Sequence, residues 1–433
     1  MNYFIKTYGC QMNIHESEKV AKILEDLGYI STNDIELADI IAFNTCCIRE
    51  TAESKIKGHI GELKRLKQLN PKLIIVIFGC MTQQTSVASL VAKRFSYVDI
   101  VIGTTNLHLL KDKILAIKPK KQIIDVDECS AHPELNSSRT SYPNAWVNII
   151  YGCNNFCSYC IVPYVRGREH SRNKLDIINE VKQLIDEGYK EITLLGQNVN
   201  SYGNDLQDGS NFADLLAEIA TLDGHFRLRF MTSHPKDLSQ KVIDTIAKYP
   251  KICHSVHLPV QSGSDEVLRK MNRRYTRQHY IDLVNSIKST ISNVGLSSDI
   301  MVGFPGETEQ DFLDTLDLVR QVRLTSCFCF VYSRRKGTLA NDMVQVPQAI
   351  KTDRIKRLIE TQNQITKEIS KTYEGNTYEV LIEDTNTRFV DTYCGRTDCG
   401  KLVNVKSKVN LIGEFIKVKI KKSQSATLWG EIL

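Results

Sequence analysis

Three cysteines lie within eight positions of the stretch "GCNNFCSYC", at Cys153, Cys157 and Cys160. Thiolates are soft ligands that select zinc, copper(I) or iron–sulfur clusters. Zinc motifs usually supply pairs of cysteines that add up to four ligands, whereas this spacing, Cys-x3-Cys-x2-Cys, supplies three. Three thiolates on a four-iron cluster leave one iron open for a substrate or a cofactor. The spacing therefore predicts a metal cluster with one open position.

Three further cysteines each end a short apolar run, namely Cys10 in "YFIKTYGC", Cys46 in "ADIIAFNTC" and Cys80 in "KLIIVIFGC". The runs alternate with helical patterns, which predicts a parallel sheet domain over residues 1–125. The carboxyl ends of parallel strands share one edge, where open α/β sheets bind ligands. We therefore expect these three thiols to be gathered at one place. We expect the neighbouring Cys47 to point elsewhere, because strand residues alternate between faces.

The βα alternation recurs over residues 140–345, where the thiol-rich loop follows the first strand. Candidate strands are "AWVNIIYGC", "EITLLGQ", "RLRFMTS", "CHSVHLPV", "GLSSDIMVG" and "SCFCFVYS". Six βα units in a row predict a barrel or a curved parallel sheet, with the active site at the carboxyl ends of its strands. Residues 346–373 read as a connecting helix, and residues 374–433 as a small all-β module, predicted to be a barrel.

Composition sets the class of protein. The 433 residues are 42% hydrophobic and 24% charged, which is typical of a globular protein without membrane spans. The N-terminal residues do not resemble a signal peptide, so we expect a cytoplasmic protein. Thirteen cysteines in such a chain favour metal binding or catalysis over disulfides. The net charge of +6 permits a nucleic-acid partner without requiring one.

The triad at Cys153, Cys157 and Cys160 after a barrel strand resembles the radical S-adenosylmethionine (radical SAM) enzymes. "YGCQMN", "NTC", "FGC", "YCIVPYVRGREHSR", "LLGQNVNSYG", "TSHP", "HLPVQSGS" and "SSDIMVGFPGET" are together similar to the methylthiotransferases, above all the tRNA-modifying MiaB type. The last block, with "GRTDCGKLVNV", resembles their RNA-binding TRAM module. The resemblance covers essentially the whole chain.

The resemblance implies an activity and its cofactors. Cys10, Cys46 and Cys80 match the ligands of an auxiliary 4Fe-4S cluster, and Cys153, Cys157 and Cys160 match those of the radical SAM cluster. Two S-adenosylmethionine molecules would serve to place a methylthio group on carbon 2 of an isopentenyl-adenosine next to the anticodon. One would methylate a cluster-bound sulfur, and the other would supply a radical, because a ring C–H bond is too inert for acid–base chemistry. The expected partners are tRNA, an electron donor and a sulfur source, and the expected state is a monomer away from membranes.

Other side chains have competing interpretations. Gln197, Gln261, Ser262 and Asp299 lie at strand ends and are candidates to hold the cofactor's ribose or methionine groups, but capping or loop hydrogen bonds would equally explain them. Arg166, Arg168, Arg172 and the basic run Arg269–Arg277 are candidates for RNA phosphate contacts, although charge runs are usually solvated faces. Structural roles are expected for His234, His257, Cys327, Cys329, Cys394 and Cys399.

Two alternatives stay open at this point. The same chemistry would also fit a threonylcarbamoyl-adenosine of tRNA or an aspartate of a ribosomal protein. The more distant alternative is a cysteine-rich, metal-containing RNA-binding protein without enzymatic activity, against which the second thiol triad argues.

Overall fold

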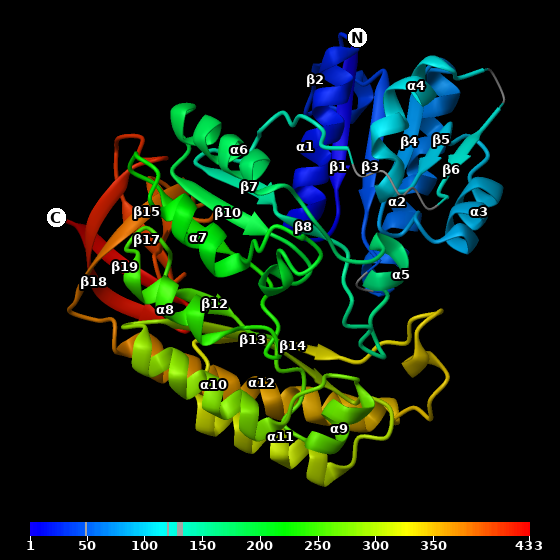
Figure 1. Cartoon of the computed structure of the whole chain (residues 1–433). Helices are drawn as coiled ribbons and strands as arrows, with labels where there is room; N and C mark the ends of the chain where they lie inside the picture. Colours follow the sequence, from blue (N-terminus) through cyan, green and yellow to red (C-terminus); the bar gives the residue numbers. More distant parts are fainter. Residues whose placement is uncertain (48–49, 119–120, 128–132) are drawn as a thin grey trace. The chain divides into compact units, whose positions relative to one another are not determined.

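The computed structural model describes the chain except residues 48–49, 119–120 and 128–132 (Figure 1). The described residues form two compact units. The first comprises Met1–Thr140, Tyr151–Asn154 and Ile161–Arg168, and the second Ser141–Ile150, Asn155–Cys160 and Glu169–Leu433. None of the described helices is long and apolar enough to cross a membrane.

The first unit is a six-stranded parallel sheet with helices on both faces. Its strands and main helices are β1 (Asn2–Thr7), α1 (Gln11–Asp26), β2 (Ile30–Ser31), β3 (Ile40–Thr45), α2 (Glu50–Leu69), β4 (Ile74–Gly79), α3 (Thr85–Arg94), β5 (Ile100–Ile102), α4 (Leu110–Leu115), β6 (Ile123–Asp125) and α5 (Val162–Arg166). Side chains of α1 and α4 pack on one face of the sheet, and those of α2 and α3 pack on the other. Burial on both faces explains why β3 and β4 read as continuous apolar runs.

The order of the strands in this sheet is β2-β1-β3-β4-β5-β6. The chain therefore leaves β1 in one direction across the sheet and returns to the other side of β1 at β3. Such a topological switch point opens a crevice at the carboxyl ends of the two strands, which is where open α/β sheets bind ligands.

The second unit contains a curved parallel sheet and its covering helices. The sheet consists of β7 (Asn144–Asn148), β10 (Glu191–Leu195), β11 (Arg227–Phe230), β12 (Ser255–His257), β13 (Gly295–Val302) and β14 (Ser326–Val331). The orders β11-β10-β7 and β12-β13-β14 are joined by a parallel bridge from Leu228 to Ile252. The helices are α6 (Lys174–Asp186), α7 (Phe212–Ala220), α8 (Gln240–Lys248), α9 (Asp265–Lys270), α10 (Arg277–Thr290), α11 (Glu309–Val322) and α12 (Gln348–Lys371). All six strands expected from the sequence are present, and the predicted partial barrel is confirmed.

The C-terminal residues form the predicted small barrel. Its strands are β15 (Thr377–Thr385), β16 (Thr392–Thr397), β17 (Leu402–Lys406), β18 (Phe415–Gln424) and β19 (Thr427–Ile432), closed in the order β15-β16-β17-β19-β18. The preceding helix α12 is more than a connector, because its Leu358 and Ile365 belong to the core of the curved sheet.

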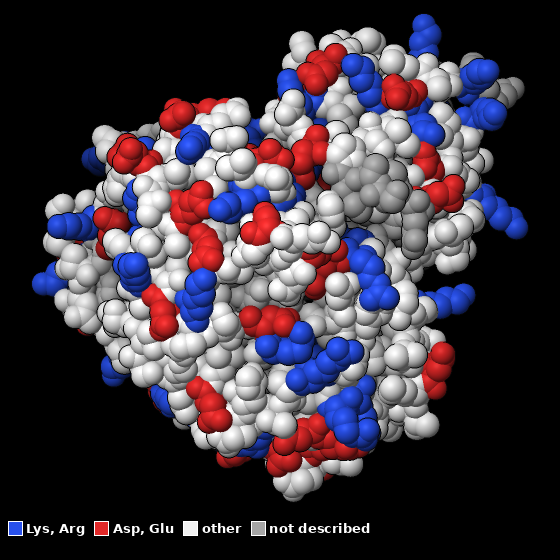
Figure 2. Space-filling model, in the orientation of Figure 1, with Lys and Arg blue, Asp and Glu red and all other residues white. Residues whose placement is uncertain are grey.

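Charged side chains are spread over the surface. On the face drawn in Figure 2, acidic and basic side chains are interspersed. The chain has 56 basic and 50 acidic residues, so the two signs nearly balance. Electrostatic attraction of a polyanion would therefore depend on local groups of lysine and arginine rather than on the net charge.

Candidate metal-cluster sites

The first thiol triad lies at the switch point of the parallel sheet. Cys46 and Cys80 directly follow β3 and β4, and Cys10 occupies the N-cap position of α1, three residues after β1. All three therefore sit at carboxyl ends of neighbouring strands, as the sequence predicts. No disulfide bond joins any of the described cysteines.

Asn13 shows how close the three cysteines are. Its Oδ1 lies 3.9 Å from Cys10 Sγ and 3.6 Å from Cys80 Sγ, and its Nδ2 donates to the carbonyl of Thr45, the residue before Cys46. Gly9 adds a second constraint, because a Cβ atom there would lie 3.0 Å from Cys46 Cβ. The turn after β1 therefore brings Cys10 and Cys46 together.

A buried arginine completes this site. Arg166, only 7% exposed, donates from Nη2 to Cys80 Sγ at 2.9 Å and to Asn13 Oδ1 at 3.2 Å. Its Nη1 donates to Glu16 Oε1 at 2.6 Å. Burial opposes the charge, but Cys80, Glu16 and Cys10 together raise the pKa of Arg166 well above its ordinary value, so it is a cation. Arg166 is thus unavailable to RNA phosphates, and that expectation is wrong because Glu16 provides a buried partner that the sequence does not reveal.

Cys47 also differs from its expected position. Its side chain is buried and hydrogen-bonds to Cys80, rather than pointing elsewhere. The physical reason is that β3 ends at Thr45, so the alternation of strand faces does not extend to residues 46 and 47. This hydrogen bond and Arg166 lower the pKa of Cys80, against the opposite effect of burial, and the same bond raises the pKa of Cys47.

The donor set of this site fits an iron–sulfur cluster. Soft thiols are gathered at a strand-end crevice beside a cation that offsets thiolate charge. Among the described residues, no group of three His, Cys, Asp or Glu side chains surrounds a single metal-ion position. A cubane cluster does not need such a position, because each cysteine binds a different iron.

The second triad occupies the loop between β8 (Ile150–Tyr151) and α5. In the second unit, Cys157 is buried, and the amide of Cys160 donates to its carbonyl oxygen. Arg273, 5% exposed, directs Nη1 to Cys157 Sγ at 3.5 Å and donates from Nη2 to the carbonyl of Pro259 at 2.7 Å. This arginine belongs to the basic run that was a candidate for RNA phosphate contacts, and its burial removes it from that role. A soft donor set next to a buried cation again fits a cluster.

Comparisons with known proteins agree with this donor chemistry. The Radical SAM superfamily matches residues 147–319, the uncharacterized protein family UPF0004 matches residues 2–103, and the TRAM domain matches residues 371–433. A curated relative from Clostridium botulinum (strain Loch Maree / Type A3), named tRNA-2-methylthio-N(6)-dimethylallyladenosine synthase, is 52% identical over 99% of this chain and 96% of its own length. The chain belongs to the radical SAM tRNA methylthiotransferase family.

Other similar proteins agree. A relative with the same name from Thermoanaerobacter pseudethanolicus is 48% identical over 100% of this chain and 92% of its own length. Among solved structures, the radical S-adenosylmethionine methyltransferase TsrM from Kitasatospora setae superposes with a TM-score of 0.57 at 15% identity, covering 79% of this chain and 77% of TsrM. At that identity the likeness shows the fold alone.

In this methylthiotransferase, the candidate cofactor-binding residues lie at or near the strand ends, and they differ in their contacts and burial. Gln261 has a left-handed backbone (φ 70°) and bridges to Ile300 of β13. Asp299 lies on β13, with Oδ2 3.6 Å from His257 Nε2. Ser262 is fully buried, and its hydroxyl contacts Thr315 Oγ1 and accepts from the amide of Ser264, which matches the capping interpretation. Gln197 is half-buried, two residues after β10.

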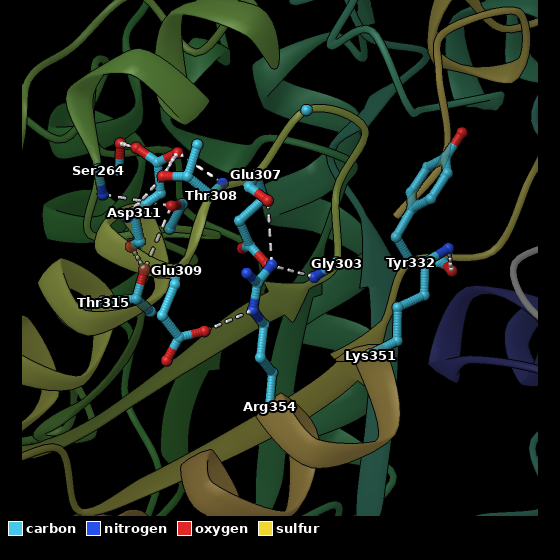
Figure 3. Close-up of polar contacts among 12 residues, drawn as sticks. Ser264, Gly303, Glu307, Thr308, Glu309, Asp311, Thr315, Tyr332, Lys351 and Arg354 are labelled. Carbon is cyan, nitrogen blue, oxygen red and sulfur yellow. Dashed lines mark hydrogen bonds and ion pairs between the residues drawn. The ribbon is translucent and has the colours of Figure 1, made fainter. Parts of the chain in front are cut away.

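The loop after β13 is held by a polar network that the sequence does not predict (Figure 3). Glu307 accepts from the amide of Gly303 at 2.7 Å and from Arg354 Nη1 at 2.8 Å. Thr308 and Asp311 form a reciprocal capping box at the start of α11. A Thr followed three residues later by an acidic residue is a sequence signal for such a helix start.

The remaining expectations concern structural roles. Burial, with Arg273 and Lys236, lowers the pKa of His234 to about 2, so this histidine is neutral near pH 7. Cys399 lies in the core of the C-terminal barrel, against Tyr373 and Thr397.

Arg172 is also buried and pairs with Glu180 at 2.7 Å, so of the three arginines past the loop only Arg168 is exposed.

Proposed function

We propose that this chain adds a methylthio group to carbon 2 of an isopentenyl (dimethylallyl) adenosine next to the anticodon of tRNA. The observation that carries the proposal is the occurrence of two separate cysteine triads, each with a buried arginine directed at one of its sulfur atoms. The names of the two relatives above contain the same nucleoside, and no observation favours threonylcarbamoyl-adenosine or a ribosomal aspartate instead.

Membership of the radical SAM superfamily implies a 4Fe-4S cluster and S-adenosylmethionine. We assign Cys153, Cys157 and Cys160 to that cluster, with its open iron for the cofactor, and Cys10, Cys46 and Cys80 to a second 4Fe-4S cluster. When bound, these groups supply the radical that activates an inert ring C–H bond and the sulfur that replaces its hydrogen. The reaction also needs a cytoplasmic electron donor and a sulfur source.

The protein's own residues position these groups. Asn13 and Gly9 hold the turn after β1 against the ends of β3 and β4, which fixes the spacing of the first triad. In the second unit, Arg273 ties Cys157 to the carbonyl of Pro259, two residues after β12. We propose that Gln197, Gln261 and Asp299 contact S-adenosylmethionine, and that Ser262 shapes the loop through its bond to Thr315.

Nucleoside analysis of cellular tRNA tests the target. In a strain lacking this protein, we expect mass spectrometry to find isopentenyl-adenosine where the methylthio derivative normally stands. A plasmid carrying the natural gene should restore the derivative, whereas a Cys46→Ala copy should not. Persistence of methylthio-isopentenyl-adenosine in the deletion strain, with loss of another methylthio nucleoside, would assign the enzyme to that other target.

A further inference from the structure

The arginine at the first thiol triad contacts a cysteine sulfur in addition to its ion pair with a glutamate. Glu16 engages only Nη1 of Arg166, while Nη2 lies 2.9 Å from Cys80 Sγ. Hydrogen bonds from a charged donor to a charged acceptor are about twice as strong as neutral ones, and low local dielectric strengthens them further. The contact therefore acts on the electron density of that sulfur.

The position of Arg166 is fixed by packed elements. Arg166 ends α5, and the preceding Val165 belongs to the apolar core on the α2–α3 face of the sheet. Glu16 and Asn13, which accept hydrogen bonds from Nη1 and Nη2 of Arg166, both lie on α1, the helix that begins after Cys10. A guanidinium held from two sides keeps its distance to Cys80 when the charge on the sulfur changes.

We propose that Arg166 raises the reduction potential of the cluster held by Cys10, Cys46 and Cys80, acting through its hydrogen bond to Cys80. The inference rests on the proposed function, since it assumes a cluster at this triad. One-electron reduction adds a negative charge that spreads onto the ligand sulfurs. A nearby cation and an N–H donor stabilise that reduced state more than the oxidised one, and hydrogen bonds to cluster sulfurs are a known determinant of potential.

Glu16 gives the inference a sign test. Its carboxylate holds Arg166 but also places a negative charge near Cys80. Removing the positive charge at Arg166 should lower the potential, and removing the negative charge at Glu16 should raise it. If Arg166 and Glu16 had only a structural role, the two substitutions would not shift the reduction potential in opposite directions.

The experiment isolates this cluster in a protein with Cys153, Cys157 and Cys160 changed to alanine. After anaerobic reconstitution with iron and sulfide, iron content is measured first. The midpoint potential then follows from a dithionite titration monitored by electron paramagnetic resonance. Arg166→Met should lower the reduced-to-oxidised ratio at a fixed potential about tenfold, which is a shift of about 59 mV for one electron. Arg166→Lys should retain most of the parent's potential, and Glu16→Gln should shift it upward.

Arg354→Met is the matched control, because Arg354 is likewise buried and paired with a glutamate, Glu307 (Figure 3). It should leave the potential unchanged. An unchanged potential in cluster-replete Arg166→Met, or an equal shift in the control, would overturn the inference. If Arg166→Met holds no cluster, the potentials of Arg166→Gln and Arg166→Lys are compared instead. The inference requires a lower potential in the neutral Arg166→Gln than in the charged Arg166→Lys, and equal potentials refute it. A parent without iron would instead overturn the proposed cluster site itself.

Discussion

At the scale of single residues, the chemistry of this chain depends on which thiols are free to bind iron. Cys46 and Cys47 are neighbours and both buried, yet their surroundings differ. Cys47 shares the core on the α2–α3 face with Cys80. Beside Cys46, the carbonyl of the preceding Thr45 accepts from Asn13 of α1, and Gly9 lies against Cys46 Cβ. The assignment of Cys46, and not Cys47, as a cluster ligand stays a prediction that follows the family motif.

Replacing one cysteine in each triad should separate two partial activities. We expect Cys157→Ala to abolish cleavage of S-adenosylmethionine, because an incomplete site loses the open iron that holds the cofactor. Cys46→Ala should leave that cleavage largely intact while stopping methylthio transfer to tRNA. Chromatography of cofactor fragments and mass spectrometry of tRNA digests measure the two activities. Normal transfer by the Cys46 variant would show that the first triad does not hold the auxiliary cluster.

The neighbouring thiol supplies the matched control for that pair. Cys47→Ser keeps a hydrogen-bond donor beside Cys80, so we expect both clusters and both activities to remain. A fall in iron content by about one cluster per chain would show that Cys47, and not Cys46, is the ligand.

At the scale of secondary-structure elements, the spacing of the first triad depends on the close approach of β3 and β4. Thr45 and Gly79 are register partners at the ends of these strands, directly before Cys46 and Cys80. Gly79 has φ +108°, and a Cβ atom there would lie 2.5 Å from the carbonyl oxygen of Thr45. Backbone atoms of a paired strand cannot move aside to make room for the Cβ atom, whereas the end of a flexible side chain could.

Gly79→Ala should therefore disturb the auxiliary cluster site and should cost more folding stability than an alanine with positive φ normally does. Gly28→Ala is the control, because Gly28 also has a positive φ (+88°) but meets no atom within 4 Å. That control should lose about 1–2 kcal/mol of stability and keep its iron. Gly79→Ala should lose more stability and part of the auxiliary iron, as measured by urea unfolding and iron analysis. Equal results for the two variants would mean that the strand ends do not set the site.

Most of these elements follow from the sequence, but the partners of the buried charges do not. Continuous apolar runs ending in cysteine were enough to place Cys46 and Cys80 at one sheet edge, because parallel strands share their direction. Arg166 and Arg273 looked like surface charges, since burial of a guanidinium depends on a partner distant in sequence. Glu16 is 150 residues from Arg166, and Cys157 is 116 residues from Arg273. Helix and strand periodicity carries no information on such pairs.

At the scale of the whole molecule, the second unit combines the curved sheet and the C-terminal barrel through buried contacts. Arg227 of β11 donates to the carbonyls of Arg396 and Glu379, and Arg229 reaches the carbonyl of Asp398. The α-carbon of Gly295 lies so close to the carbonyl of Cys399 that a Cβ atom would collide with it. Deleting the barrel would strip partners from two buried arginines, so its role in binding RNA is better tested by surface substitutions.

The last prediction uses the exposed lysines of β18. Lys417 and Lys419 alternate with the buried Val418 and Ile420, so they stand on the solvent face of the strand and can meet phosphates without a change in fold. We expect Lys417→Glu with Lys419→Glu to weaken tRNA binding and to reduce the slope of log affinity against log salt by about two, since each lost phosphate contact removes about one. Lys182→Glu with Lys248→Glu, on exposed positions of α6 and α8, changes the net charge equally and should leave the slope near that of the natural protein. Fluorescence anisotropy with labelled tRNA over a salt series measures both. An unchanged slope in the β18 variant, with both clusters present, would move the RNA-binding surface away from this strand.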